Sequence, residues 1–192
     1  TTRHWIEVVN GNEFKQASIS TFILGFVTAF PGTLLFAAIA WSLLHLRHWQ
    51  REVASILIWI PWAFPGIILG AAFLQIFLFT PGVSVLYGTI FPLLIAILIK
   101  ELPIGVHMMR VSIDQMGGDM LQSAQLTGAS AFRVFRKILL PLNFPALVVV
   151  FLLIFGVAVR DISIVILIAP PNFQTLSILT FKYATSSNFE AA

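Results

Sequence analysis

Long apolar runs, separated by short polar stretches, set the pattern of this 192-residue chain. Residues 17–46 and 53–79 contain no Asp, Glu, Lys or Arg, and residues 89–109 and 142–168 are almost as apolar. Because about 20 apolar residues cross the hydrocarbon core of a bilayer as a helix, each of these runs predicts a membrane span. Residues 174–192 look like the start of a fifth span, which we expect to be incomplete in this chain. The pattern therefore predicts an all-α integral membrane protein, a polytopic helical bundle.

Composition supports this interpretation, since 58% of the residues are hydrophobic and only 10% are charged. A soluble domain carries about 25% charged residues, so this chain has too few to cover a surface in water. The absence of cysteine excludes disulfides and cysteine-ligated metal sites.

We expect residues 1–16 to lie outside the membrane on the extracytoplasmic side, and residues 17–192 to form one transmembrane module. The first segment, TTRHWIEVVNGNEFKQ, fits either a short amphipathic interfacial helix or a solvated linker, and it is not a signal peptide. The chain lacks an initial Met and stops while a segment is beginning. We therefore expect it to be a piece of a longer polypeptide, truncated at its C-terminus.

The distribution of Lys and Arg predicts the orientation of the spans. Because successive spans cross in opposite directions, residues 1–16, 80–88 and 169–175 lie on one side of the membrane. Their only Lys and Arg residues are Arg3 and Lys15. The other side receives a larger set: Arg47, Arg51, Arg110, Arg133, Arg136 and Lys137. Because short cytoplasmic loops carry the excess of positive charge, residues 47–52 and 110–141 are predicted to face the cytoplasm.

Prolines predict bends within the spans, at Pro31, Pro61, Pro65 and Pro103. Pro61 and Pro65 remove two backbone donors from one stretch, which should bend or break the second span. Gly66 and Gly70 follow at the spacing that lets another helix approach closely. A flexible helix lining a path and a tightly packed helix with an incidental kink both fit these residues.

The most polar connection, residues 110–141, predicts two short helices around a glycine corner. Asp119 and Gln122 have the spacing of a capping box, and Gly128 would end the first helix. Ser130 would cap a second helix that Pro141 ends. The second helix would place one set of residues toward the bundle or lipid: Phe132, Phe135, Ile138 and Leu139. Arg133, Arg136 and Lys137 would lie on another face, suited either to anionic lipid or to a docking protein.

Charged residues also occur inside the predicted spans, as Lys100 and Glu101 in the third and Arg160 and Asp161 in the fourth. Intramembrane charges are costly, so they mark either a polar translocation path or an inter-helix ion pair. Both interpretations remain open from sequence.

The chain offers no candidate catalytic or metal-binding constellation. Its histidines are scattered, and no two stand four residues apart on one predicted helix, so we expect no metal site. The spans contain neither a paired-Asp nor a Ser/His arrangement, and no Gly-x-x-x-x-Gly-Lys-Ser/Thr loop occurs. We therefore expect the chain not to be an enzyme.

Ala124 and Gly128 stand four residues apart, and Ile138-Leu139-Leu140-Pro141 follows, with Pro145-Ala146-Leu147 beyond it. This pattern resembles the Glu-Ala-Ala (EAA) motif of the permease subunits of binding-protein-dependent ATP-binding cassette importers. Gln122 stands where the family has Glu, and Ser123 where it has the first Ala.

Other segments are most similar to the ferric-iron-type permeases of that family. They are residues 65–70 (PGIILG), 87–89 (YGT), 102–106 (LPIGV) and 158–163 (AVRDIS), with residues 175–177 and 188–192 resembling the start of the last span. Permeases of this subgroup often carry two such modules in one chain.

The resemblance implies a transmembrane permease in the bacterial inner membrane, with ferric iron as the first expected substrate. Organophosphonate, polyamine and sulfate or thiosulfate importers share much of the pattern. The implied partners are cytoplasmic ATPase subunits that bind ATP and Mg, an extracytoplasmic binding protein, a second permease module and the lipid bilayer, but no nucleic acid. No cofactor is implied in this chain. The implied coupling-loop residues are Gln122, Ser123, Ala124, Gly128, Ala129, Arg133, Ile138, Leu140 and Pro141. A structural membrane protein whose basic loop binds anionic lipid is the alternative from a different class.

Overall fold

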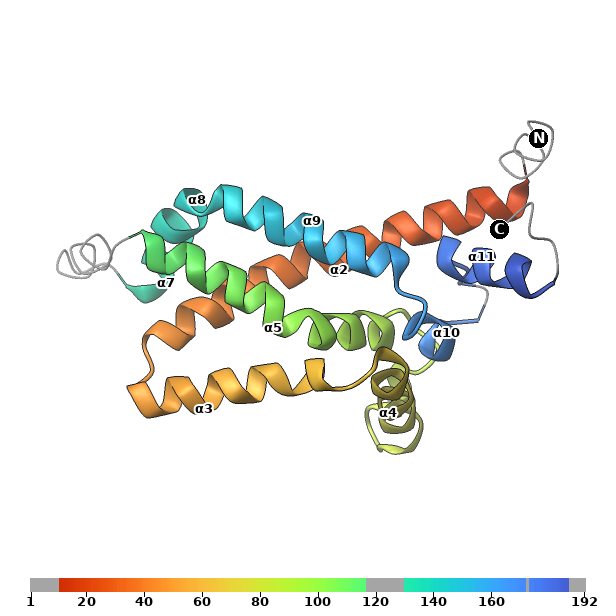
Figure 1. The fold of residues 1–192 in the computed structure, drawn as a ribbon, viewed down its shortest axis with the longest axis horizontal. Helices are drawn as coiled ribbons and strands as arrows, with labels where there is room; N and C mark the ends of the chain where they lie inside the picture. The colour runs from red at the N-terminus through yellow and green to blue at the C-terminus, as the bar shows by residue number, and fades with distance from the viewer. Residues whose placement is uncertain (1–10, 117–129, 172, 187–192) are drawn as a thin grey trace. The chain divides into compact units, whose positions relative to one another are not determined.

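The computed structural model describes residues 11–116, 130–171 and 173–186, and within these ranges the chain consists of helices joined by turns (Figure 1). The first half contains α2 (Asn12–Leu44), α3 (His48–Trp59), a 3-10 turn (Ile60–Ala63), α4 (Gly66–Phe79), a second 3-10 turn (Ser84–Leu86) and α5 (Phe91–Gln115). The second half contains α7 (Ala131–Val134), a π-helical turn (Phe135–Leu139), α8 (Leu140–Leu142), α9 (Phe144–Arg160), α10 (Val165–Ile168) and α11 (Leu176–Thr185). The prediction of an all-helical membrane fold is confirmed.

Helices α2 and α5 are each long and apolar enough to cross a membrane. Two broken pairs, α3 with α4 and α7–α8 with α9, raise the number of candidate spans among the described residues to four if each pair counts as one. At about 1.5 Å per residue, the 25 residues of α5 exceed a hydrocarbon core of about 30 Å, so its polar last turns can reach the interface. Of the expected fifth span, the structure describes α11, which has 10 residues.

Two helices are longer than the sequence pattern predicted. Helix α2 begins at Asn12, so residues 12–16 belong to it, whereas residues 1–10 of the expected lead-in lie outside the described part. Helix α5 runs six residues past residue 109, to Gln115. In α2, Glu13 receives hydrogen bonds of 3.0 and 3.1 Å from the Lys182 ammonium, which ties this added first turn to α11.

The four prolines expected to bend helices lie in two different settings. Pro31 and Pro103 lie inside α2 and α5, and both helices continue through them. Pro61 and Pro65 lie in the interruption between α3 and α4, where the chain forms a 3-10 turn. Two missing N–H donors within five residues remove more of the helical ladder than a single proline does.

The described residues divide into two compact units. Of the described residues, unit 1 comprises 11–28, 64–100, 155–171 and 173–186, and unit 2 comprises 29–63, 101–116 and 130–154. Helices α2, α5 and α9 each contribute one part to each unit.

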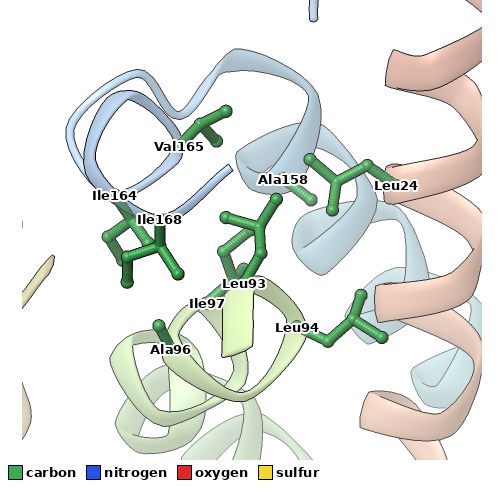
Figure 2. Packing of buried hydrophobic residues seen from close by; sticks show 9 residues of the cluster. All are labelled: Leu24, Leu93, Leu94, Ala96, Ile97, Ala158, Ile164, Val165 and Ile168. Atoms are coloured by element: carbon green, nitrogen blue, oxygen red, sulfur yellow. The ribbon is translucent and has the colours of Figure 1, made fainter. Parts of the chain in front are cut away.

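Unit 1 is organised around an apolar cluster, which is shown in Figure 2. It consists of Leu24, Leu93, Leu94, Ala96, Ile97, Ala158, Ile164, Val165 and Ile168. These residues come from α2, the first half of α5, the end of α9 and the chain around α10. The short α10 thereby gains tertiary contacts that an isolated helix of one turn needs in order to form.

Unit 2 contains a close approach between α2 and α5. A Cβ added at Gly105 would lie well inside contact distance of the Phe36 ring, and the Phe36 side chain is fully buried. Glycine at position 105 therefore lets the two helices pack with an aromatic ring directly against the α5 backbone.

Candidate functional site

Only part of the predicted coupling loop falls within the described residues. Gln122, Ser123, Ala124, Gly128 and Ala129 lie outside them. The other residues implied by the resemblance are described, and they are Arg133, Ile138, Leu140 and Pro141. What the structure adds is how the two ends of this loop are held.

The helix after the loop begins at Ser130. Its hydroxyl oxygen accepts a hydrogen bond of 3.4 Å from the Arg133 backbone N–H, and Ser130 itself has extended backbone geometry. A serine in this position satisfies one of the N–H groups that the first helical turn leaves without a partner. The helical run then continues through Pro141 to Leu142, so the prediction that Pro141 ends it is wrong.

The buried residues of this helix overlap with the face expected from sequence, and Arg133, Arg136 and Lys137 are exposed as expected. Val134 and Leu139 are fully buried, Phe135 and Ile138 are partly buried, and Phe132, expected to lie toward the bundle or lipid, is 71% exposed. Residues 135–139 form a π-helical turn, whose i to i+5 hydrogen bonding places residues five apart on the same side. Val134 and Leu139 stand five apart, so the π-helical turn explains why Val134, which the expected α-helical face did not include, is also buried.

A buried asparagine joins the two ends of the loop. The Asn143 Oδ1 atom accepts a hydrogen bond of 2.7 Å from the Ser112 hydroxyl, near the end of α5. Its Nδ2 donates to the Leu139 carbonyl at 3.0 Å and lies 2.6 Å from the Met116 sulfur. The residue is 2% exposed. Sequence analysis did not identify Asn143, because a single asparagine between apolar residues carries no spacing signal.

An ionic cluster ties α3 to the last turns of α5. The Asp114 carboxylate lies 3.6 Å from Arg51 Nη2 and 3.8 Å from Arg110 Nε. Arg110 Nη1 also donates to the Ser55 hydroxyl at 3.3 Å. Arg51 and Arg110, predicted on separate loops of the same side, therefore meet at one carboxylate within unit 2.

In unit 1, the structure pairs Lys100 with Asp161. The Lys100 ammonium donates to one carboxylate oxygen of Asp161, and the other oxygen accepts from the Ile164 backbone N–H at 2.8 Å. The Asp161 side chain is 3% exposed and that of Lys100 is 24% exposed. A Cβ at Gly66 would lie 3.2 Å from Lys100 Nζ and 3.0 Å from the Ser163 Cβ, so the start of α4 packs directly on this pair.

The other two intramembrane charges have different surroundings. Glu101 is 4% exposed and belongs to unit 2, whereas Arg160 is exposed at the end of α9 in unit 1. Of the four charges considered in the sequence, the structure thus brings together Lys100 and Asp161. Within the described ranges, no group of three or more His, Asp or Glu side chains is arranged to hold a metal ion.

Comparison with known proteins identifies similar chains. A family model described as "Binding-protein-dependent transport system inner membrane component" matches residues 33–190, which is more than half of the chain. The Fe(3+)-transport system permease protein FbpB 2 of Haemophilus influenzae is 23% identical over 181 residues, covering 94% of this chain and 35% of that protein. The chain thus spans about a third of the length of that relative.

A second relative from Haemophilus influenzae, the spermidine/putrescine transport system permease protein PotC, is 26% identical over 180 residues, covering 93% of this chain and 68% of that protein. Among solved structures, a chain of the bacterial alginate ABC transporter in complex with alginate pentasaccharide-bound periplasmic protein superposes with a TM-score of 0.77 at 15% identity. That superposition covers 98% of this chain and 73% of the other, and it shows a shared fold.

Proposed function

The chain belongs to the family of binding-protein-dependent transport system inner membrane components, and from that premise we propose that it lines the substrate path of an ATP-driven importer. We further propose that residues 119–141 couple it to a cytoplasmic ATPase, which binds ATP and Mg. The observation that supports the coupling role is that side-chain contacts hold the chain before and after this segment. Asn143 and Asp114 fix the described chain on either side of it. A segment held in this way can transmit a displacement imposed by a partner.

The helix after Ser130 supports a docking role. Val134 and Leu139 anchor it to unit 2, whereas Arg133, Arg136 and Lys137 are exposed and available to a partner. In the proposal, the short segment around Ala124–Gly128 seats on the ATPase. When the ATPase changes conformation, it displaces this docked segment, and the spans alternate between two arrangements.

We propose that residues 47–52 and 110–141 face the cytoplasm of the bacterial cell. The excess of Lys and Arg in these connections supports this orientation. The contacts of Arg51 and Arg110 with Asp114 agree with it, because both connections then begin at the same end of unit 2. The binding protein would approach from the opposite side. A second permease module, in the same chain or in another copy, would complete the path.

We propose ferric iron as the substrate, supported by the segments that resemble ferric-iron-type permeases and by the Fe(3+) permease relative. A polyamine is the second candidate, because the spermidine/putrescine relative has comparable identity and is covered over two thirds of its length. Uptake of radiolabelled ferric iron and spermidine into proteoliposomes, each with the candidate binding protein, separates the two. Iron uptake that depends on ATP supports the first candidate, and spermidine uptake alone refutes it.

The coupling proposal is tested on the full-length protein with its ATPase subunit. Gly128→Trp, or deletion of residues 120–130, should abolish co-purification with the ATPase. Gly156→Trp is the matched control, since a Cβ at Gly156 would have no neighbour within 4 Å and the position lies on α9. Unchanged co-purification of the Gly128→Trp protein would refute docking through this segment.

A further inference from the structure

Asn143 lies at the break between two helices. Its backbone has φ −89° and ψ 14°, outside the helical range, between the end of α8 and the start of α9. Its N–H donates to the Leu139 carbonyl at 2.9 Å, and its carbonyl accepts from the Leu147 N–H at 2.9 Å. The backbone on both sides of the break is thus hydrogen-bonded without help from the Asn143 side chain.

The Asn143 side chain is held in one orientation by its partners. The Leu139 carbonyl can only accept a hydrogen bond, so the Asn143 amide nitrogen must face it. The Asn143 oxygen then faces Ser112, whose hydroxyl donates to it. Because an unpaired buried amide is costly, this arrangement is favoured over any in which Asn143 leaves its partners.

The partners of Asn143 come from both ends of the connection between α5 and α9. Ser112 lies in the last turn of α5 and Met116 directly after it, and Leu139 lies in the π-helical turn before α9. Residues 112 and 143 stand 31 positions apart. The Asn143 side chain therefore links the end of α5 to the turn before α9. We call its contacts with Ser112, Met116 and Leu139 the Asn143 bridge.

We propose that Asn143 is a positioning residue for energy coupling. The Asn143 bridge holds the end of α5 against the start of α9, so a displacement of the segment between them moves both helices together. Without the bridge, the two ends move apart and absorb the displacement before it reaches the spans. This inference rests on the proposed function, since it presupposes an ATPase that acts on residues 119–141.

The test uses the full-length protein reconstituted with its ATPase and binding protein, and it measures substrate transported per ATP hydrolysed. Asn143→Leu removes the side-chain bonds at similar volume. Ser112→Ala removes the bond to α5 and leaves the bond from Asn143 to Leu139. Thr33→Val is the matched control, because Thr33 is also buried in unit 2 and its hydroxyl donates to the Ala29 carbonyl in its own helix.

We expect Asn143→Leu, which removes both side-chain hydrogen bonds, to lower transport per ATP roughly tenfold, at about 0.5–1.5 kcal/mol per bond. Ser112→Ala should lower it less, and Thr33→Val should leave it unchanged. The midpoint of thermal unfolding is measured for each variant, because a purely structural role would lower the midpoint without changing the ratio of transport to ATP hydrolysis.

The inference is overturned if Asn143→Leu transports as much per ATP as the wild type, or if Thr33→Val lowers the ratio equally. If Asn143→Leu fails to accumulate, Ser112→Ala decides the matter, and a wild-type ratio in that variant overturns the inference. These outcomes leave the proposed function intact. A wild-type complex that neither binds the ATPase nor transports would instead refute the proposed function, and the role of Asn143 with it.

Discussion

Lys100 and Asp161 form an ion pair in unit 1 although they stand 61 positions apart in the sequence. The pair joins the first half of α5 to the chain that follows α9, and Asp161 also accepts from the Ile164 backbone N–H. Asp161 therefore makes two kinds of interaction. It forms an ion pair with Lys100, and it caps the turn before α10 by accepting from the Ile164 N–H. Two substitutions at this position can separate these interactions.

Asp161→Asn should destabilise the protein less than Asp161→Leu does. The amide oxygen of Asn can still accept from Ile164, whereas Leu leaves both this N–H and the Lys100 ammonium without their partner. Removing one member of a buried pair costs about 3–5 kcal/mol, and the partial exposure of Lys100 places the expected loss toward the lower end. Thermal unfolding in detergent measures the order, and equal midpoints for the two variants would contradict the capping role.

The double variant Lys100→Met with Asp161→Asn distinguishes a structural pair from a polar lining of the path. It removes both charges and keeps the cap, so a structural pair predicts transport close to the wild type. A lining role predicts a strong loss of transport in a protein that still folds. Uptake into proteoliposomes measures the difference, with each single variant as the reference.

Gly105→Ala should destabilise unit 2, because the new Cβ meets the buried Phe36 ring. Overpacking of this kind costs about 1–3 kcal/mol. Gly156→Ala is the control, since its Cβ would have no neighbour within 4 Å and alanine favours a helix over glycine. Phe36→Leu should recover part of the loss in the Gly105→Ala background, and additive losses in the double variant would argue against the contact.

Asp114→Asn should change global stability little, by about 0–1 kcal/mol, because the carboxylate is half-exposed and surface ion pairs contribute weakly. Its contacts with Arg51 and Arg110 should nevertheless make the stability of the wild type depend on salt. We expect the difference in unfolding midpoint between wild type and variant to shrink as ionic strength rises. A difference that is constant with salt would show that the pairs are not the cause.

The sequence predicts those features of this protein that depend on local pattern. Apolar runs predict the helices, and paired prolines at 61 and 65 mark a stretch where the helix is interrupted. The charges at Lys100 and Asp161 indicate either an inter-helix pair or a polar path, because charges within a membrane need compensation. The hydrophobic pattern did not predict the last six residues of α5, because charged residues such as Arg110 and Asp114 are typical of a loop. Their contacts with α3 are visible only in the structure.

Features that depend on tertiary contacts could not be predicted in this way. The role of Asn143 depends on a serine 31 positions earlier, and nothing in the local sequence relates the two. The π-helical turn adds Val134 to the buried residues without changing the hydrophobic pattern that suggested an α-helix. In both cases the information lies in how distant segments pack.

The register of the helix after Ser130 can be tested by truncating single side chains. Leu139 is fully buried, so Leu139→Ala should cost about 2–5 kcal/mol through lost contacts and a residual cavity. Phe132→Ala removes a larger side chain, but Phe132 is 71% exposed and its truncation should cost far less. An α-helical register with the face of Phe132, Phe135 and Leu139 turned toward the bundle would instead bury Phe132, and it predicts comparable losses for both truncations. Thermal unfolding of the two variants in the same detergent measures the ratio, and a loss for Phe132→Ala as large as that for Leu139→Ala would contradict the observed register.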